Sequence, residues 1–428
     1  MRLFHSRFCS GNYPVFPGSF ALLFQLFFWI GTGYALPAES KGVPPADHPF
    51  RLTDTGKTTP WFHSFFNAHP ELAGQAAVLG KSHPVQLIYT RIDRAANGNV
   101  VLQNEYYDLQ AGQRFDPGMA AALPLAVCAL RRMAVLGDSV GIDKSTTMIT
   151  EPGPAGLPAA MNDPTTADGK PSLSHYLKRM LVAGDADAYN RVFEFTGRQY
   201  LQARLSAQGY TNMQLPARIG QQFNDVQNRY SNALVFYDDD LKIMYREPLR
   251  AVNPGKSGSL SEKNLSSLED LHNMLVSLIF PTRFTATKRF DISPADQTYL
   301  FHYMGLLPTE SILPPYRDDT VTYYPCLRKL LYCGTARGGE FPQALRIFNV
   351  SDTAGGRFTD VAYFADSSAK IEFFLSATMM RSGGKLTEAD PAAVFLKELG
   401  RAVYAQELKR PRRFAPDLKS YFSGYGKK

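Results

Sequence analysis

The sequence predicts an α+β protein, in which an antiparallel five-stranded sheet flanked by terminal helices carries an all-helical second lobe. Three observations predict this class. Two strand-like runs lie near the N-terminus, three lie in the C-terminal third, and the residues between them carry apolar side chains at helical spacing. Because strands come from both ends of the chain, the simplest arrangement is one sheet built from both ends, with the middle inserted as a second lobe.

The composition is typical of a globular protein. The chain has 428 residues, of which 44% are hydrophobic, so it can bury a substantial core. Much of its net charge of +7 lies in the basic tail, residues 410–428, and the body is nearly neutral. This distribution does not favour nucleic-acid binding. No spacing of His and Cys suggests a metal and no motif suggests a cofactor, so we expect neither.

The N-terminus has the order of a secretory signal. Arg2 and Arg7 precede an apolar run at 20–30, which is followed by the small residues Gly33 and Ala35. The run is too short to span a membrane comfortably. We therefore expect a cleaved signal peptide (1–35), a polar linker (36–60), no membrane span in the mature chain, and export to the periplasm or the medium. An uncleaved N-terminal anchor is the alternative.

The sheet elements follow from alternation and turn signals. Strand-like runs at 83–93 and 100–109 flank Asn97-Gly98, a strong hairpin signal. A short helix is expected before them. The remaining strands and the closing helix are expected at 343–350, 357–366, 369–380 and 390–410.

The middle of the chain reads as helices. A buried helix follows Arg114, and Ser267 and Ser293 are candidate N-caps of two later helices. Between these, 230–247 suggests a small hairpin. The helical runs lie at 114–137, 172–197, 198–209, 267–280 and 293–308.

Three cysteines remain after signal cleavage, Cys128, Cys326 and Cys333. An odd number argues against a full disulfide framework. If 326–333 is helical, its two cysteines are about 10 Å apart at 1.5 Å per residue, beyond disulfide reach. We therefore expect all three to be small buried hydrophobic residues.

Several idiosyncratic phrases occur in a fixed order between 85 and 409, among them "DADAYNRVFEFTG", "SLEDLHNML", "LLPTESILPPY", "FTDVAYFAD" and "IEFFLSAT". In these phrases the chain resembles the class A β-lactamase and penicillin-binding protein superfamily, and within it the serine hydrolases of Bacteroidetes envelopes. The resemblance implies a β-lactamase-like two-lobed domain at 61–409. Its sheet lobe would comprise 61–115 and 341–409, and its helical lobe 116–340.

The first family motif, Ser-x-x-Lys, places an amine one helical turn from the nucleophilic hydroxyl. The family reads Pro-x-Ser-x-x-Lys-Leu-Pro, and this chain reads "PGMAAALP". Met119 stands at the Ser position and Ala122 at the Lys position, while Pro117 and Pro124 are retained. The retained prolines support this alignment of the motif.

The other two motifs are degraded as well. Ser-Asp-Asn falls on Gly184, Asp185 and Ala186, so only its Asp survives. The family's Asn-Lys-x-Gly falls on 349–352. Asn349 is kept, Val350 replaces the Lys that would bind a substrate carboxylate, Ser351 is the middle residue and Asp352 replaces Gly.

Loss of all three motifs predicts a pseudoenzyme that acts as an envelope binding protein. Its ligand would be a cell-wall peptide, a glycan fragment or an envelope protein. Two alternatives stay open: a divergent β-lactam, peptide or ester hydrolase using Glu310, Ser351 or Asp352, and a structural subunit of an envelope complex. Other suggestive residues have simpler explanations as turns or packed side chains: "SSAK" at 367–370, "YDDD" at 237–240, and His175, His272 and His302.

Overall fold

The computed structural model describes residues 56–220, 223–251, 263–338, 341–353, 355–381, 386–422 and 425. The expected signal peptide and most of the expected linker lie outside these residues. The basic tail is described over 410–422 and at 425.

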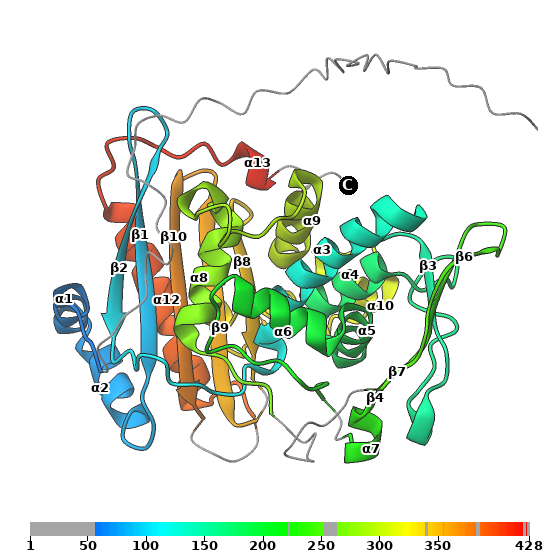
Figure 1. Cartoon of the computed structure of the whole chain (residues 1–428). Coiled ribbons are helices and arrows are strands. Elements are labelled where there is room, and N and C mark those ends of the chain that lie inside the picture. Colours follow the sequence, from blue (N-terminus) through cyan, green and yellow to red (C-terminus); the bar gives the residue numbers. More distant parts are fainter. Residues whose placement is uncertain are drawn as a thin grey trace, which may run out of the picture. The chain divides into compact units, whose positions relative to one another are not determined.

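A five-stranded antiparallel sheet forms the centre of one lobe (Figure 1). Its order is β2-β1-β10-β9-β8, so strands from both ends of the chain pair directly, for example Ile88 with Ser376. The predicted α+β class and sheet are confirmed. The turn of the N-terminal hairpin contains Gly98 at φ +79°, a conformation that favours glycine. The strands are β1 (Gln86–Arg94), β2 (Val100–Tyr107), β8 (Leu345–Asp352), β9 (Arg357–Asp366) and β10 (Ile371–Met380).

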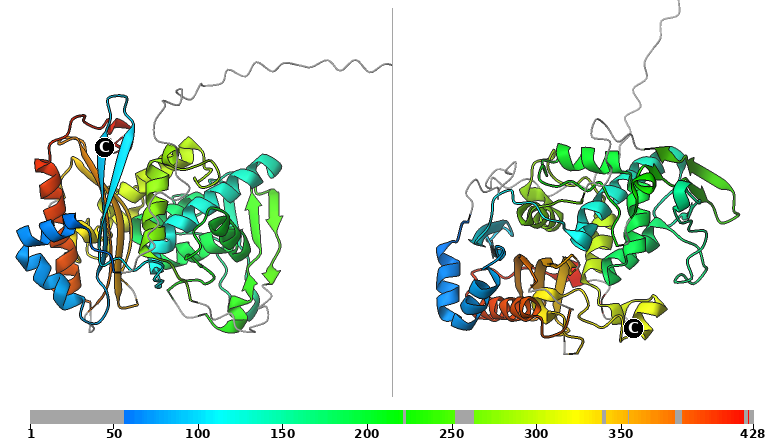
Figure 2. Two further views of the ribbon diagram at one scale, coloured as in Figure 1. Left: turned by 60° about the vertical axis from the view of Figure 1, so that its left-hand side comes forward. Right: turned by 90° about the horizontal axis from the view of Figure 1, so that it is seen from below.

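Terminal helices cover one face of this sheet, as Figure 2 shows. The expected single helix before β1 is two helices, because Pro70 removes a backbone donor at the point where α1 would continue. Phe62 and Phe395, from the two ends of the chain, are fully buried in the core on this face. The helices on this face are the terminal helices α1 (Pro60–Ala68), α2 (Pro70–Leu79) and α12 (Pro391–Lys409), together with the short internal helix α11 (Leu330–Cys333).

The helical lobe packs against the opposite face (Figure 2). The predicted caps are confirmed: Ser267 accepts a hydrogen bond from the backbone of Asp270, and Ser293 accepts one from Asp296. A 3₁₀ turn, η1 (Gly118–Ala121), leads into the core helix α3 (Ala122–Val140). The later helices are α8 (Leu268–Ile279), α9 (Pro294–Gly305), α10 (Pro314–Asp318) and the tail helix α13 (Lys419–Phe422).

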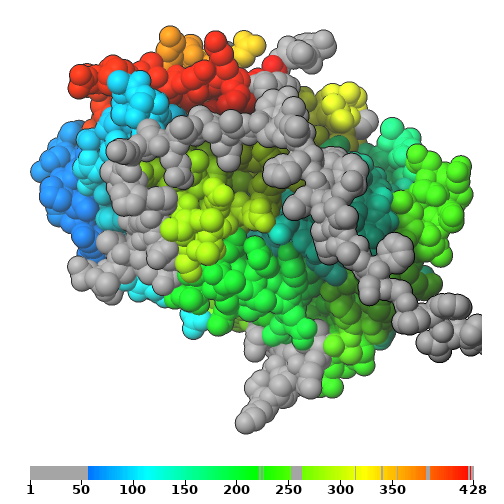
Figure 3. Space-filling model, turned by 45° about the horizontal axis from the view of Figure 1, so that its top comes forward, coloured from blue at the N-terminus to red at the C-terminus, as the bar shows by residue number. Residues whose placement is uncertain are grey.

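The expectation that the second lobe is all-helical is wrong. The predicted hairpin is β5 and β6, but Thr147–Thr150 adds a third strand to it, because its β-branched residues suit an extended backbone. Figure 3 shows residues of the α1–α2 region (blue) at one end of the surface and residues near this hairpin (green) at the other. The other elements here are β3 (Thr147–Thr150), β4 (Tyr230–Ser231), β5 (Leu234–Tyr237), β6 (Ile243–Glu247), β7 (Arg250–Ala251), α4 (Leu173–Ala183), α5 (Ala186–Thr196), α6 (Arg198–Ala207) and α7 (Asp225–Asn228). Short 3₁₀ turns lie at η2 (Pro154–Gly156), η4 (Pro281–Arg283) and η5 (Pro308–Glu310).

The helical stretch Gly118–Val140 has a mean hydropathy of 1.7 over its most apolar window. Among the described residues it alone is long and apolar enough to cross a membrane by composition. Within this protein 72% of that window is buried, so the stretch acts as a core helix.

The expectation for Cys326 and Cys333 is wrong, because they form a disulfide with their Cα atoms 5.8 Å apart. The helix begins only at Leu330, and the preceding residues turn back instead of extending the helix. We refer to residues 326–333 as the disulfide loop. Cys128 is a free, buried cysteine, as expected.

Candidate functional site

The fold brings the first and third motif segments together at the end of β8. The backbone N–H of Met119 donates to Asp352 Oδ1 at 3.0 Å. Gly118, with φ +49°, lies so close that an added Cβ would come within 2.3 Å of Asp352 Oδ2. Only glycine fits beside this carboxylate. We refer to the meeting point of residues 118–122, 184–186 and 350–352 as the motif site.

The side chain of Arg328, from the disulfide loop, reaches the motif site. A Cβ on Gly184 would lie 2.6 Å from Arg328 Nη1, so the guanidinium occupies the space beside the second motif. Burial lowers the pKa of Arg328, and the negative charges of Asp352 and Asp360 partly oppose this. A cation from a separate segment therefore lies between the second and third motifs.

The first-motif positions present no reactive group. Met119 is 4% exposed and Ala122 is 1% exposed, and both belong to the core of the helical lobe. A thioether and a methyl group thus stand where the sequence resemblance places the family's Ser and Lys. Pro124 lies in the first turn of α3, where its missing N–H is tolerated.

The second-motif residues hold the junction between α4 and α5. Gly184 ends α4 at φ +69°. Asp185 caps α5 by accepting from the N–H of Ala188 at 3.0 Å, and it pairs with Arg179 at 2.6 Å. Ala186 faces Gly220, where an added Cβ would come within 2.9 Å of the Ala186 methyl. Asp185 therefore has a structural role in this geometry.

The third-motif residues alternate across the sheet. Val350 is in the core of the helical lobe, whereas the hydroxyl of Ser351 donates to the main-chain carbonyl of Arg328 at 2.9 Å. Asn349 Nδ2 donates to the same carbonyl at 2.5 Å and to Asp360 Oδ1 at 2.7 Å. Ser351 is 1% exposed, so its hydroxyl anchors the disulfide loop and does not face a substrate.

Glu310, the remaining candidate base, is also engaged. Its Oε2 accepts from the backbone N–H of Leu307 at 3.0 Å, and its Oε1 pairs with Arg346 at 2.9 Å. These contacts close the short turn η5, which matches a capping role.

A buried polar network behind β8 was not predicted from the sequence. Lys329 Nζ donates to the carbonyls of Met304 and Ile347, both at 2.7 Å, and to Asn349 Oδ1 at 2.8 Å. Burial lowers the pKa of Lys329 to about 7 and raises that of Asp360 to about 6. The one signal in the sequence was a pair of cations inside the apolar phrase "CLRKLLYC". All three ammonium bonds stay within the protein, so the network fixes the disulfide loop to the sheet.

The histidines are packed side chains. His272 bonds to Thr90 Oγ1 at 2.9 Å and Ser376 Oγ at 2.8 Å, and burial lowers its pKa to about 3. His175 Nε2 lies 2.6 Å from Thr165 Oγ1, and the His302 ring stacks on Tyr425. Within the described ranges, no three His, Cys, Asp or Glu side chains gather as metal ligands would.

The literal matches to motifs lie in turns. Residues 367–370 are an exposed turn between β9 and β10. Asp238 in the "YDDD" phrase accepts from the backbone N–H groups of Asp240 and Lys242, at 3.1 and 2.8 Å, which closes the β5–β6 turn.

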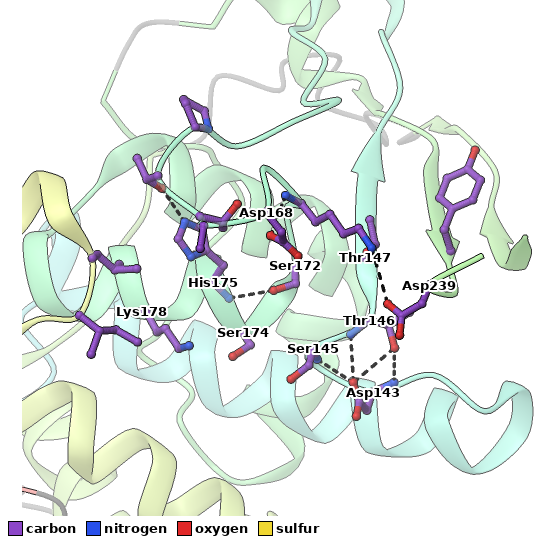
Figure 4. Close-up of a pocket in the computed structure, with 18 of the residues that line it drawn as sticks. Asp143, Ser145, Thr146, Thr147, Asp168, Ser172, Ser174, His175, Lys178 and Asp239 are labelled. Atoms are coloured by element: carbon purple, nitrogen blue, oxygen red, sulfur yellow. Dashed lines mark hydrogen bonds and ion pairs between the residues drawn. The ribbon is translucent and has the colours of Figure 1, made fainter. Parts of the chain in front are cut away.

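A cavity of about 1190 Å³ lies in the helical lobe, and none of the motif-site residues line it. Figure 4 shows that α4 and its N-cap residue Ser172 form one wall, to which the helix supplies Ser174, His175 and Lys178. The segment before β3 and the β5–β6 turn supply carboxylates, including Asp143 and Asp239. This cavity is therefore separate from the motif site.

Comparison with known proteins finds no matching family model and no matching curated protein. Solved structures of β-lactamases are similar in arrangement. A β-lactamase from Sphaerobacter thermophilus is 11% identical, with 79% of this chain and 98% of that chain covered and a TM-score of 0.44. An ancestral class A β-lactamase is 16% identical (79% and 98% covered, TM-score 0.43), as is a β-lactamase from Xanthomonas campestris (78% and 96%, TM-score 0.42). At these identities and scores the similarity carries no argument about chemistry or ligand.

Proposed function

We propose that this chain is a non-catalytic binding protein of the cell envelope, a β-lactamase-like serine hydrolase homologue of the Bacteroidetes type whose active-site motifs have degenerated. The observation that carries the proposal is the state of the motif site. The guanidinium of Arg328 and the carboxylate of Asp352 occupy it, and Met119 and Ala122 form an apolar wall beside them.

Acyl transfer by a serine hydrolase needs a hydroxyl next to a base. Removing an activated serine lowers the turnover number by about 10⁶-fold in a well-studied hydrolase. Here the hydroxyl of Ser351 and the carboxylate of Glu310 are held by hydrogen bonds or ion pairs within the protein. These contacts argue against the divergent-hydrolase alternative, because neither group is free to attack or deprotonate a substrate.

Two features support export. The N-terminal 35 residues read as a signal peptide, and the disulfide Cys326–Cys333 is typical of proteins that fold in an oxidising compartment. Cell fractionation tests this part of the proposal. Recovery of a chain that begins near residue 36 outside the cytoplasm is expected, and a full-length cytoplasmic chain would contradict it.

Turnover assays test the absence of catalysis. The purified mature chain is incubated with nitrocefin and with a panel of ester and amide substrates, beside an active β-lactamase. We expect hydrolysis at the buffer rate for every substrate. Turnover above buffer that disappears in Ser351→Ala or Glu310→Gln would replace this proposal with the divergent hydrolase.

A further inference from the structure

The cavity of the helical lobe has two ends of opposite charge. Ser174 and Lys178 are four residues apart on α4 and therefore share a face, which lines the cavity. In Figure 4 Lys178 lies at one side, and Asp143 and Asp239 lie at the other.

The acidic end gathers carboxylates from three segments, at Asp143, Asp168 and the pair Asp238 and Asp239. Two further lining carboxylates belong to the segment of Ile312: Asp318 pairs with Arg317 at 2.7 Å, and Asp319 Oδ1 accepts from the backbone N–H of Thr322 at 3.0 Å. Most of their contacts are with neutral backbone N–H groups: Asp143 Oδ1 accepts from Ser145 and Thr146, and Asp168 Oδ1 accepts from Lys170. Lys170 is the one lining ammonium near them in the described residues, and its Nζ is 3.6 Å from Asp239. This end therefore keeps a negative excess that attracts an ammonium group.

The basic end is formed by Lys178. Its ammonium lies 5.5 Å from the ring centre of Tyr303, and no carboxylate of the described residues pairs with it. Burial lowers its pKa, so its charged form has lost solvation without gaining an anion in return. A ligand carboxylate at this position would restore the lost stabilisation.

Apolar side chains also line the cavity. Met244 and Ile312 are 38% and 72% exposed, and Leu313 and Pro315 lie beside Ile312 in the cavity wall. The volume of about 1190 Å³ slightly exceeds the roughly 300–1,000 Å³ of ordinary small-molecule pockets. It suits a molecule of a few residues that carries both charged groups and apolar side chains.

We propose that this cavity binds a short peptide with both termini free, its ammonium group at the aspartates and its carboxylate at Lys178. The proposal rests on the non-catalytic binding role argued above and assigns that role to a site outside the motif site. Peptide side chains would contact Met244 and Ile312.

Calorimetric titration with the tripeptide Ala-Leu-Ala, its N-acetyl form and its C-terminal amide tests the two ends separately. We expect the free tripeptide to bind more tightly than either blocked form, by about fivefold per blocked end, which is the size of one partly exposed ion pair. Equal binding of all three forms, or no binding of any, would overturn the proposal.

Variants at each end of the cavity test which residues bind the carboxylate and which bind the ammonium group of the peptide. Lys178→Gln should remove the preference for the free acid over the amide and leave the preference for the free amine. Asp168→Asn with Asp239→Asn should do the reverse. Lys57→Gln and Glu71→Gln, which lie outside the cavity, are the matched controls and should change neither preference. If a variant at one end weakens binding of all three peptide forms equally, that end does not bind the peptide group proposed for it.

The two proposals fail separately. If the tripeptides do not bind while nitrocefin stays intact, the cavity proposal is wrong and the non-catalytic reading stands. If a substrate is turned over while the tripeptide still binds with the expected end preferences, the non-catalytic reading fails and the peptide site stands.

Discussion

The side chain of Arg328 offers the sharpest test of how the motif site is held. In the parent protein the Arg328 guanidinium fills the space beside Gly184 so closely that a Cβ on Gly184 would clash with it. Arg328→Ala removes the guanidinium from this space. Asp352 and Asp360 lose the positive charge that opposes theirs. The substitution therefore leaves both an empty volume and an uncompensated negative charge.

The expected loss in the free energy of unfolding is smaller than that of a fully buried ion pair. Breaking a fully buried ion pair by removing one partner costs about 3–5 kcal/mol. Arg328 is partly exposed, so water can enter and stabilise the remaining carboxylates. We therefore expect the free energy of unfolding to fall by about 2–3 kcal/mol.

Urea unfolding followed by circular dichroism measures this loss. Arg328→Lys is the control: it keeps the charge but loses the planar fork, so it should recover part of the lost stability. Methylguanidinium at low millimolar concentration should raise the melting temperature of Arg328→Ala more than that of the parent. A loss below about 0.5 kcal/mol, typical of a surface site, would refute the placement of Arg328 as a space-filling cation.

Three further predictions follow from the same contacts. Introducing a Ser-x-x-Lys pair with Met119→Ser and Ala122→Lys should give no nitrocefin turnover, because Arg328 still fills the site; measurable turnover would contradict this. Burial raises the pKa of Asp360 to about 6, above its unfolded value, so its contribution to stability is greatest below pH 4 and falls by about 2–3 kcal/mol as the pH rises past 6. The stability difference between parent and Asp360→Asn, measured by urea unfolding from pH 4 to 7, should fall accordingly, and a constant difference refutes the assignment. Replacing both cysteines of the disulfide loop by Ala should lower the free energy of unfolding by about 2 kcal/mol, from loop-closure entropy, and make it insensitive to reductant; an unchanged stability would contradict the pairing.

The main sheet was predictable because its signals are local. Alternating strands and the Asn97-Gly98 turn each act within a few residues, so single segments identify them. The helix caps Ser267 and Ser293 in the other lobe were predictable for the same reason. The third strand of the small sheet was missed because Thr147–Thr150 is too short to produce a period.

The motif site was predictable only in part. The expected motif positions include Met119 and Asp352, which the fold brings into contact. Arg328 was missed because it comes from a segment that carries no motif, and its position depends on long-range bonds to Asn349 and Ser351. The disulfide was missed because 326–333 was assumed to be one helix, whereas the helix begins at Leu330.

Intact-protein mass spectrometry after incubation with a penicillin tests the central claim most directly. The motif site lacks a free hydroxyl beside a base, so the mass of the mature chain should not change, even at long times and high penicillin concentration. A mass increase equal to one penicillin, mapped by peptide digestion to any serine, would contradict the account.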